Sequence, residues 1–533
     1  MKKILFITFN CISTFMIAQV TPGGIPRTGQ GTGISGQTTI SIAPFGTAIP
    51  FIPNSPNQTG GFGAPTGDQD RAVFWLHGLD GDETSWAKAA DASQHGVPAF
   101  AARKIISMRP EYGEGAGLEA AAEDVRIEME QWADHQRSIG IDPKNNFIIA
   151  HSQGGLVEQA LLYKDFCFDP NFHGPAYGGV VSFGAGHKGA MILNNVEILK
   201  DWLKQGCSDL AAGPAEEFSN SFIGQIVGLF VEDKDNPLLP ENITKNCETF
   251  VKEVSKFLDL TKPITKDYHV PADGGSKLYD YESCIIAEAG NIAKVAFYGV
   301  EPHKDLPWRT LNWQVLKNSN DEDYFEANDD DELTMKINNF KDKYKAEIAL
   351  REIYTIILKG DYDLPCSPVD WIFRPIECAI GTKKLDDNLD ELEKYKTGLR
   401  WLNTSDDKWQ EIIGAIVITK TTKHFCQCVD QYTNEEKYEI NDPSECDPRP
   451  EPGKKCWPTK ETYITKSYKE SDGIVLAESA SAMPGANHNP TSDPLRRMEN
   501  SSHNQMRNDL NTKRKLNYLY NGKTNDFFYT NLR

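Results

Sequence analysis

The segment NNFIIAHSQGGLVEQALL, residues 145–162, constrains the fold of this chain most strongly. An apolar run ends in a small residue, His-Ser-Gln-Gly-Gly follows, and a pattern typical of a helix comes next. Ser152 is therefore predicted to lie where a strand turns sharply into a helix, the place where hydrolases expose a nucleophile. Ala150 and Gly154 supply the small residues that such a turn needs. The alternative is an ordinary serine at the start of a helix.

Short apolar runs recur on both sides of this segment. They occur in RAVFWLHGLDGDETSW, ARKIISMRP, GGVVSFGAGHKG and IAKVAFYGV, and helical periodicity separates some of them, as over residues 118–139. Buried strands that alternate with helices predict an α/β fold, a mostly parallel sheet with helices on both faces. The active site of such a fold lies at the carboxyl ends of the strands, where Gly78, Ser152 and Gly184 would fall.

Changes in composition predict the organisation of the 533 residues. We expect a signal peptide at 1–18, a Gly/Thr/Pro-rich leader at 19–68, the N-terminal half of a hydrolase core at 69–190, a helical cap or lid at 191–290, a return to the core at 291–316, an acidic and helical insertion at 317–420, a Cys-rich β-hairpin at 421–460, and the C-terminal part of the core at 461–533. The apolar face of residues 218–230 is expected either to pack as a cap helix or to form a mobile lid.

The first twenty residues, MKKILFITFNCISTFMIAQV, have the pattern of a secretory signal. Two lysines precede an apolar stretch, and Ala18 stands at the expected cleavage site. No later segment of the sequence is long and apolar enough to span a bilayer. We therefore expect a secreted protein, in the periplasm or outside the cell, with no integral membrane segment after the signal is removed.

Cysteine usage agrees with an oxidising compartment. Of the 11 cysteines, Cys11 lies in the signal and the other ten follow it, an even number that predicts several disulfides. The zinc alternative needs paired Cys-x-x-Cys motifs, and Cys426-Gln-Cys428 is the nearest approach to one. The spacing does not determine which cysteines pair.

The charge balance excludes some partners. A formal net charge of -20 with no large basic block argues against nucleic acid and against electrostatic docking on anionic lipid. The acidic stretch NSNDEDYFEANDDDELTMK lacks the spacing of a calcium loop and is interpreted as a solvated face. The sequence leaves the oligomeric state open.

A serine nucleophile needs a base, a carboxylate that orients the base, and donors for the oxyanion. Asp472, before an apolar run in KESDGIVLAESASAMPGA, is the predicted acid, with Glu470 and Glu478 as alternatives. The base should follow the acid in the chain, which leaves His488 and His503, and spacing does not decide between them.

The oxyanion donors are predicted to be two backbone N–H groups, of Leu79 after the first strand and of Gln153 after the nucleophile. His187, in FGAGHKGA, is expected to be a structural histidine that bonds the loop backbone.

These motifs together resemble the α/β-hydrolase superfamily, and within it bacterial secreted lipases and the GPI inositol-deacylase-like group. AHSQGG resembles the lipase nucleophile turn, FGAGHKGA the Thr-Pro-His-x-Gly turn after the next strand, and SDGIVLAESA the loop of the catalytic Asp. SSHNQMRN resembles the segment of the catalytic His, which favours His503 over His488, with Asn508 matching a later Asn. Gln505 stands where some of these lipases have an Asp of a calcium site, so no structural calcium is expected.

The resemblance implies a secreted serine hydrolase that cleaves carboxylic esters, including lipids, through a Ser152–His503–Asp472 triad and an acyl-enzyme, with no cofactor and no metal. One alternative is an amidase or acyltransferase that uses the same triad. Another is a catalytically inactive binding or attachment protein on a hydrolase scaffold.

Overall fold

The computed structural model describes residues 38–40, 49–51, 71–79, 81–82, 85–86, 89–90, 93–94, 105–113, 117–168, 177–211, 251–252, 263–267, 269–270, 277–289, 292–302, 304–310, 330–362, 364–430, 435–446, 454–486, 495–507 and 509–520. The chain forms two compact units, Met1–Thr39 and Ile40–Arg533. The predicted signal peptide, the apolar face of residues 218–230, His488 and Asn508 lie outside the described residues. The first described strands are β1 (Thr38–Ile40) and β2 (Ile49–Phe51).

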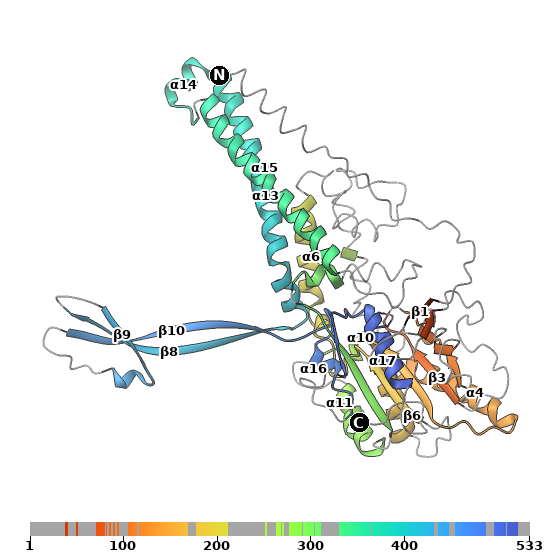
Figure 1. The fold of residues 1–533 in the computed structure, drawn as a ribbon. Helices are drawn as coiled ribbons and strands as arrows, with labels where there is room; N and C mark the ends of the chain where they lie inside the picture. Colours follow the sequence, from red (N-terminus) through yellow and green to blue (C-terminus); the bar gives the residue numbers. More distant parts are fainter. Residues whose placement is uncertain are drawn as a thin grey trace. The chain divides into compact units, whose positions relative to one another are not determined.

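Six parallel strands form the central sheet, in the spatial order β11–β7–β6–β5–β3–β4 (Figure 1). Their bounds are β3 (Arg71–Leu76), β4 (Ile105–Met108), β5 (Asn146–His151), β6 (Tyr177–Phe183), β7 (Ala293–Val300) and β11 (Arg497–Glu499). The predicted parallel sheet is thereby confirmed, and the three-residue edge strand β11 is an addition to it. Because β5 pairs with β3 and not with β4, the strand order reverses between β3 and β5. Ligands of open α/β sheets bind at the carboxyl end of such a switch point.

Side chains alternate between the two faces of the sheet, and each face is covered. Trp75 belongs to the apolar core that includes Leu516 of α17. Phe74 points to the opposite core and meets the ring of Trp132 of α4 edge to face, 5.8 Å between centroids. The covering helices are α4 (Leu118–Ser138), α5 (Gln153–Tyr163), α11 (Lys277–Glu288) and α17 (Leu510–Tyr520). Helices on both faces are therefore confirmed.

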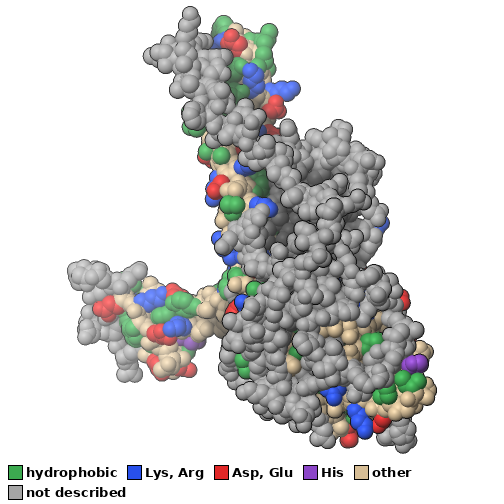
Figure 2. All heavy atoms as spheres, turned by 45° about the vertical axis from the view of Figure 1, so that its right-hand side comes forward, with side chains coloured by type: hydrophobic (Ala, Val, Ile, Leu, Met, Phe, Trp, Pro, Cys, Tyr) green, Lys and Arg blue, Asp and Glu red, His purple; other side chains and the backbone are tan. Residues whose placement is uncertain are grey.

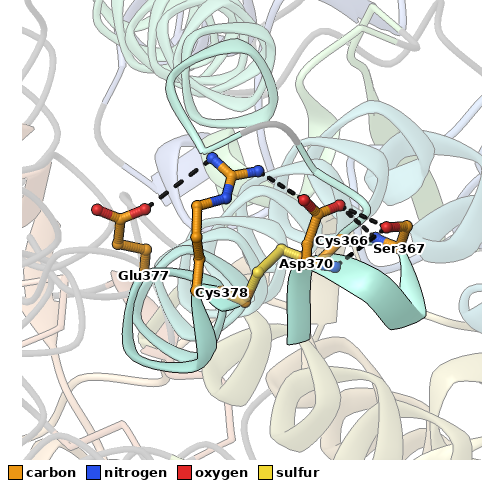
Figure 3. The surroundings of a disulfide bond; sticks show 6 residues. Cys366, Ser367, Asp370, Glu377 and Cys378 are labelled. Carbon is orange, nitrogen blue, oxygen red and sulfur yellow. Dashed lines mark hydrogen bonds and ion pairs between the residues drawn. A yellow bond between two sulfur atoms is a disulfide. The ribbon is translucent and has the colours of Figure 1, made fainter. Parts of the chain in front are cut away.

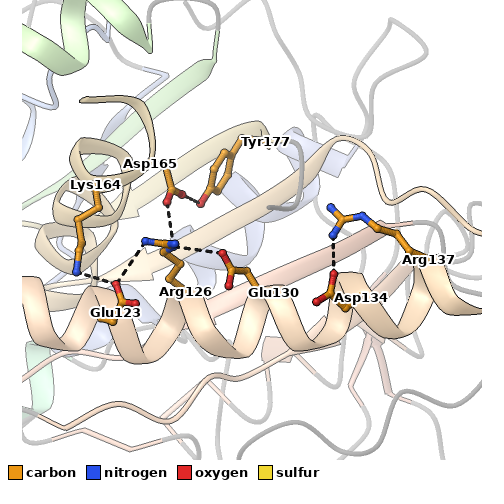
Figure 4. Close-up of polar contacts among 8 residues, drawn as sticks. All are labelled: Glu123, Arg126, Glu130, Asp134, Arg137, Lys164, Asp165 and Tyr177. Carbon is orange, nitrogen blue, oxygen red and sulfur yellow. Dashed lines mark hydrogen bonds and ion pairs between the residues drawn. The ribbon is translucent and has the colours of Figure 1, made fainter. Parts of the chain in front are cut away.

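Helix α4 follows the predicted range 118–139 closely. Val125 and Met129 are buried, but Ile127 between them is exposed. Ile127 is two residues away from each of them, which is about 200° of rotation around the helix axis. Its side chain therefore points away from the core. The outer side of α4 carries Arg126, which pairs with carboxylates of its own helix and with Asp165 of the π-helical turn Lys164–Phe168 (Figure 4).

Two mainly helical insertions interrupt the core, one before β7 and one after it. The described helices of the first are α6 (Val196–Ala211) and α10 (Pro263–Asp267), and the covering helix α11 follows them. After β7 come α13 (Asp330–Asp361), α14 (Pro368–Phe373) and α15 (Pro375–Ile412).

Helices α13 and α15 run antiparallel and are called the helical hairpin here. Lys384 donates to Tyr362, Asn388 to the Arg351 carbonyl, and Tyr344 packs on Tyr395, so later residues of α15 meet earlier residues of α13.

The C-terminal part of α15 is packed against the rest of the fold. Trp401 stacks on Trp202 of α6 with 4.9 Å between ring centroids, and Gly206 leaves the space that the indole fills. The indole N–H of Trp409 donates to the Gly473 carbonyl, 2.7 Å away. The helical hairpin is thus tied to the loop that follows Asp472.

A three-stranded antiparallel sheet follows the helical hairpin. Its strands are β8 (Ile416–Asp430), β9 (Glu435–Ile440) and β10 (Lys454–Tyr468), with β8 in the centre. It is longer than the expected range 421–460, because the alternating pattern continues until Ile416 pairs with Tyr468.

Disulfides connect Cys167 with Cys284, Cys366 with Cys378, Cys426 with Cys446, and Cys428 with Cys456. Within the described ranges, Cys426, Cys428 and Cys456 form the one group close enough to hold a metal ion, but all three sulfurs are bonded to other sulfurs. The disulfide interpretation therefore holds for these residues against the zinc alternative. No helix within the described part of the chain has the length and apolar character needed to cross a membrane.

Candidate active site

Ser152 occupies the turn between β5 and α5 with a strained backbone. Its φ of 55° and ψ of -124° lie in a region that non-glycine residues rarely adopt. The Ser152 N–H donates to the Phe183 carbonyl of β6 (2.9 Å), and the Ser152 carbonyl accepts from the Gly155 N–H (3.1 Å). Strain of this kind is characteristic of functional turns and persists where the surroundings hold it.

The turn also requires glycine where chain segments approach closely. A Cβ atom on Gly154 would lie 2.5 Å from the His77 carbonyl oxygen, and one on Gly78 would lie 2.9 Å from the Ser152 Cβ. Both distances are shorter than van der Waals contact. The glycines therefore allow the end of β3 to pack directly against Ser152 and the start of α5.

His503 links Ser152 to Asp472. The Nε2 atom of His503 lies 2.7 Å from the Ser152 Oγ, and its Nδ1 lies 2.9 Å from the Asp472 Oδ2. The His503 backbone N–H also donates to the Asp472 carbonyl (2.9 Å). His503 and Asp472 are buried, while Ser152 is partly accessible. The three predicted side chains are thus brought together in the order that proton transfer from a serine requires.

The loop around Asp472 directs its two carboxylate oxygens to different partners. Oδ1 accepts hydrogen bonds from the backbone N–H groups of Ile474 (2.9 Å) and Val475 (2.7 Å). Oδ2 is left to face His503. Gly473 makes this turn with a φ of 93°, which favours glycine.

The alternative acids lie in other surroundings. Glu470 forms an ion pair with Arg497, and Glu478 pairs with Lys469 at 2.6 Å. The alternative base His488 is outside the described residues.

His187 is buried and hydrogen-bonds the Ser182 hydroxyl (2.8 Å) and the Gln159 side-chain oxygen (3.2 Å). Both ring nitrogens of His187 thus bond side chains, and not the loop backbone as expected. Burial lowers the pKa of His187 to about 3.

The predicted oxyanion donors, Leu79 and Gln153, line the same pocket as Ser152 and His503. Two side-chain hydrogen bonds hold the segment just before Leu79. The Trp86 indole donates to the Leu76 carbonyl (2.8 Å), and the Tyr112 hydroxyl donates to the His77 carbonyl (2.5 Å). Preorganised donors of this kind avoid reorganisation when charge develops in a transition state.

The pocket beside Ser152 has a cavity volume of about 100 Å³ and is partly open to solvent. Its apolar wall comes from four different segments of the chain. These residues are Leu79, Leu156, Ile192, Leu193, Ile474 and Val475. Arg507 and Asn504 contribute polar groups near His503. An apolar wall with a few polar groups is typical of small-molecule sites.

Sequence reasoning missed residues that position the site without a motif of their own. His151, the residue before Ser152, places its Nε2 2.7 Å from the His503 carbonyl oxygen. His151 is part of the motif AHSQGG, but the motif predicts only the turn and not this contact. Trp86 and Tyr112 carried no local signal, because their carbonyl partners become neighbours through the fold.

Gln505 follows His503 by two residues in the same loop. It is buried, and its side-chain oxygen accepts from the Ser502 backbone N–H at 2.9 Å. The amide oxygen therefore closes the loop that carries His503.

The strand order, the β5–Ser152–α5 turn at its switch point and the helical insertion define an α/β-hydrolase fold. No protein-family model and no curated protein matches the chain. Among solved structures, phospholipase PlaB from Legionella pneumophila is similar at 10% identity and a TM-score of 0.25, over 43% of this chain and 39% of PlaB. Lipase 1 from Pelosinus fermentans is similar at 13% identity and 0.23, over 44% of this chain and 68% of that one.

The mature lipase BlEst2 from Bacillus licheniformis is similar at 13% identity and a TM-score of 0.19, over 37% of this chain and 64% of that one. This chain thus spans about two fifths of the length of PlaB.

Proposed function

We propose that this protein is a serine hydrolase of carboxylic esters. The observation that carries the proposal is the continuous chain of contacts from the Ser152 Oγ through His503 to Asp472, with distances of 2.7 Å and 2.9 Å. An ordinary serine at the start of a helix would need neither a strained backbone nor a buried His–Asp pair.

In the proposed mechanism, His503 takes the proton of the Ser152 hydroxyl as the oxygen attacks the ester carbonyl carbon. Asp472 holds Nδ1–H of the imidazole and stabilises its protonated form. The N–H groups of Leu79 and Gln153 bind the oxyanion of the tetrahedral intermediate. His503 then gives its proton to the departing alkoxide, which leaves Ser152 acylated. Water, activated by His503, releases the acid and regenerates the serine.

The shape of the pocket supports an ester with an apolar acyl part. Leu156, Ile192 and Leu193 form an apolar wall next to Ser152, and burying alkyl groups against such a wall is favourable. Within the superfamily, AHSQGG and SSHNQMRN support an assignment to bacterial secreted lipases and the GPI inositol-deacylase-like group. The disulfides support the proposal that the protein is exported.

The test is hydrolysis of a chain-length series of p-nitrophenyl esters by the purified protein. We expect turnover of these esters, with Ser152→Ala lowering it to background, whereas Ser138→Ala, a matched change at the exposed end of α4, retains it. A folded wild-type protein with no turnover would support the binding-protein alternative. Products that appear only with an added amine or alcohol acceptor would support acyl transfer.

A further inference from the structure

The two ends of α15 have different surroundings. The disulfide between Cys366 and Cys378 joins its N-terminal end to the segment before α14. Ser367 and Asp370 close the start of α14 with a reciprocal capping box (Figure 3). Hydrophobic side chains are exposed near this end in Figure 2. Near the C-terminal end, by contrast, Trp409 is buried, with 2% of its surface exposed. The C-terminal end of α15 is therefore the part of the helix that is built into the core.

Trp409 reaches the loop of the proposed acid. Its indole N–H donates to the carbonyl oxygen of Gly473, the residue after Asp472, at a distance of 2.7 Å. The hydrogen bond is buried and joins residues that are 64 positions apart in the chain. It is therefore a tertiary contact between the helical hairpin and the candidate site.

The contact acts on a group that also binds the acid. The Gly473 carbonyl and the Ile474 N–H belong to the same peptide group. Because a peptide group is planar, a partner that fixes the direction of its carbonyl also fixes the direction of its N–H. The Ile474 N–H donates to Asp472 Oδ1 at 2.9 Å. The indole of Trp409 thus orients, through one rigid unit, a donor to the carboxylate that faces His503.

A continuous series of hydrogen bonds results. It begins with the 2.7 Å contact from Trp409 to Gly473 and the 2.9 Å contact from the same peptide group to Asp472. It continues with the 2.9 Å contact from Asp472 to His503 and the 2.7 Å contact from His503 to Ser152. Hydrogen bonds in series polarise one another, so a donor at one end strengthens the bonds that follow.

The acid loop is held closely on both sides of Asp472. Gly473 has a φ of 93°, and a Cβ atom on it would collide with the hydroxyl of Thr310. Before the acid, the Lys469 N–H donates to the carbonyl of Ala415, just after the end of α15, at 2.8 Å. The last turns of α15 and the residues that follow them therefore contact the loop at two points.

We propose that Trp409 is a positioning residue of the Ser152–His503–Asp472 triad, and that its indole N–H holds the peptide after Asp472 in the orientation that directs the carboxylate toward His503. The inference rests on the proposed function, because it affects turnover only if the triad is catalytic. It also gives the helical hairpin a role in the reaction, since α15 supplies a support that the sheet and its covering helices do not.

The test is steady-state kinetics of the full chain on a water-soluble p-nitrophenyl ester. Trp409→Phe keeps a buried ring but removes the N–H donor. We expect kcat to fall by about 10-fold to 100-fold, because a small displacement of a reacting group is costly. Trp409 is not among the described residues that line the pocket, so KM should stay within about twofold of the wild-type value.

The matched control is Trp401→Phe. It removes a second buried indole of α15, whose N–H donates to the carbonyl of Trp202 on α6 and not to the acid loop. Both substitutions should lower the denaturant midpoint, measured by circular dichroism. Trp401→Phe should keep kcat within about twofold of the wild-type value, because it leaves the hydrogen bonds of the acid loop intact.

Trp409→His separates the donor from the bulk of the side chain. The Nε2 atom of histidine has the same place in its five-membered ring as the indole Nε1, so this variant keeps an N–H donor and loses the six-membered ring. It should be less stable than Trp409→Phe and yet have the higher kcat. A merely structural role predicts that the less stable variant also has the lower kcat.

Three results would overturn the positioning role: a wild-type kcat in folded Trp409→Phe, an equal loss of kcat in Trp401→Phe, or a kcat of Trp409→His no higher than that of Trp409→Phe. If Trp409→Phe does not fold, Trp409→His decides alone. A kcat closer to that of the wild type than to that of Asp472→Asn supports the role, and the reverse overturns it. A folded wild-type protein without turnover would reject the proposed function and this inference together, whereas the three results above leave the proposed function standing.

Discussion

The sheet and the helical hairpin place apolar side chains in opposite ways. Around β5, apolar residues such as Ile148 and Ile149 are fully buried, and the strained Ser152 follows directly. In α14, between the two helices of the hairpin, Ile372 and Phe373 are exposed to solvent. The proposed site thus stands on buried strands, whereas apolar side chains at the end of the hairpin are open to solvent. Substitutions in the two regions should consequently affect different measurements.

The largest effect is expected at the base. His503→Ala removes the proposed acceptor of the Ser152 proton, so kcat should fall by about 10⁴-fold to 10⁶-fold, the range known for serine triads. Steady-state kinetics on a water-soluble ester measures this change. His135→Ala, at an exposed position of α4, is the matched control and should keep its activity. Comparable losses in both variants would contradict a specific role for His503.

The next effect is expected at the acid. Asp472→Asn keeps the size of the side chain but weakens its hold on the His503 Nδ1–H, so kcat should fall by roughly 10⁴-fold. Glu470→Gln, two residues away, changes a residue paired with Arg497 and should have little effect on kcat. The same assay measures both, and a larger loss in Glu470→Gln would reassign the acid.

The attachment of the helical hairpin to the core should dominate the stability of the insertion. Trp401→Ala removes an indole that stacks on Trp202 and donates to its carbonyl at 3.3 Å. The resulting cavity should lower the free energy of unfolding by about 3–5 kcal/mol. Denaturant unfolding followed by circular dichroism measures the loss. An unchanged transition would mean that the hairpin is not packed on α6.

The buried Asp165 should make stability depend on pH. Burial raises its pKa to about 7 from 3.8, so between these values the folded chain keeps the proton while the unfolded chain loses it. Its contribution to stability is therefore present below about pH 4 and is lost as the pH rises to about 7, by at most about 1.4 kcal/mol per pH unit.

Asp165→Asn removes this titration and can still accept a hydrogen bond from the hydroxyl of Tyr177 (Figure 4). The variant should gain stability relative to wild type as the pH rises from 4 to 7, in denaturant unfolding at each pH. If the two proteins differ by the same free energy of unfolding at every pH from 4 to 7, Asp165 is ionised in the folded protein.

The smallest effect on stability is expected in α14, at the end of the helical hairpin. Trp371→Ala changes a side chain that is 45% exposed, and its effect on the free energy of unfolding should stay within about 0.5 kcal/mol. The comparison with Trp401→Ala sets an exposed tryptophan against a buried one. A loss of unfolding free energy as large as that of Trp401→Ala would mean that Trp371 is packed into the fold.

The strands of the sheet were predictable because runs such as FII before Ser152 are buried on both faces and read as continuous apolar segments. The turn at Ser152 was predictable because Ala150 and Gly154 supply the small residues that it needs. The disulfide partners were not, since spacing leaves them open, and β11 has only three residues.

The distant members of the site depended on more than local pattern. Asp472 and His503 follow Ser152 by more than 300 residues, and chain order with the family resemblance selected them. The fold now brings them together, while their catalytic roles stay predictions that kinetics must test. The exposure of Ile372 and Phe373 was not predicted, because the apolar pattern of a helix is the same in sequence whether its side chains are covered or exposed.

Covalent labelling shows whether Ser152 is an activated nucleophile. The folded protein would be treated with a fluorophosphonate probe, digested, and the adduct located by mass spectrometry. We expect one modified residue, Ser152, with no adduct in Ser152→Ala and a strongly slowed reaction in His503→Ala. A folded wild-type protein that gains no adduct, or gains it at another serine, would rule out Ser152 as the nucleophile.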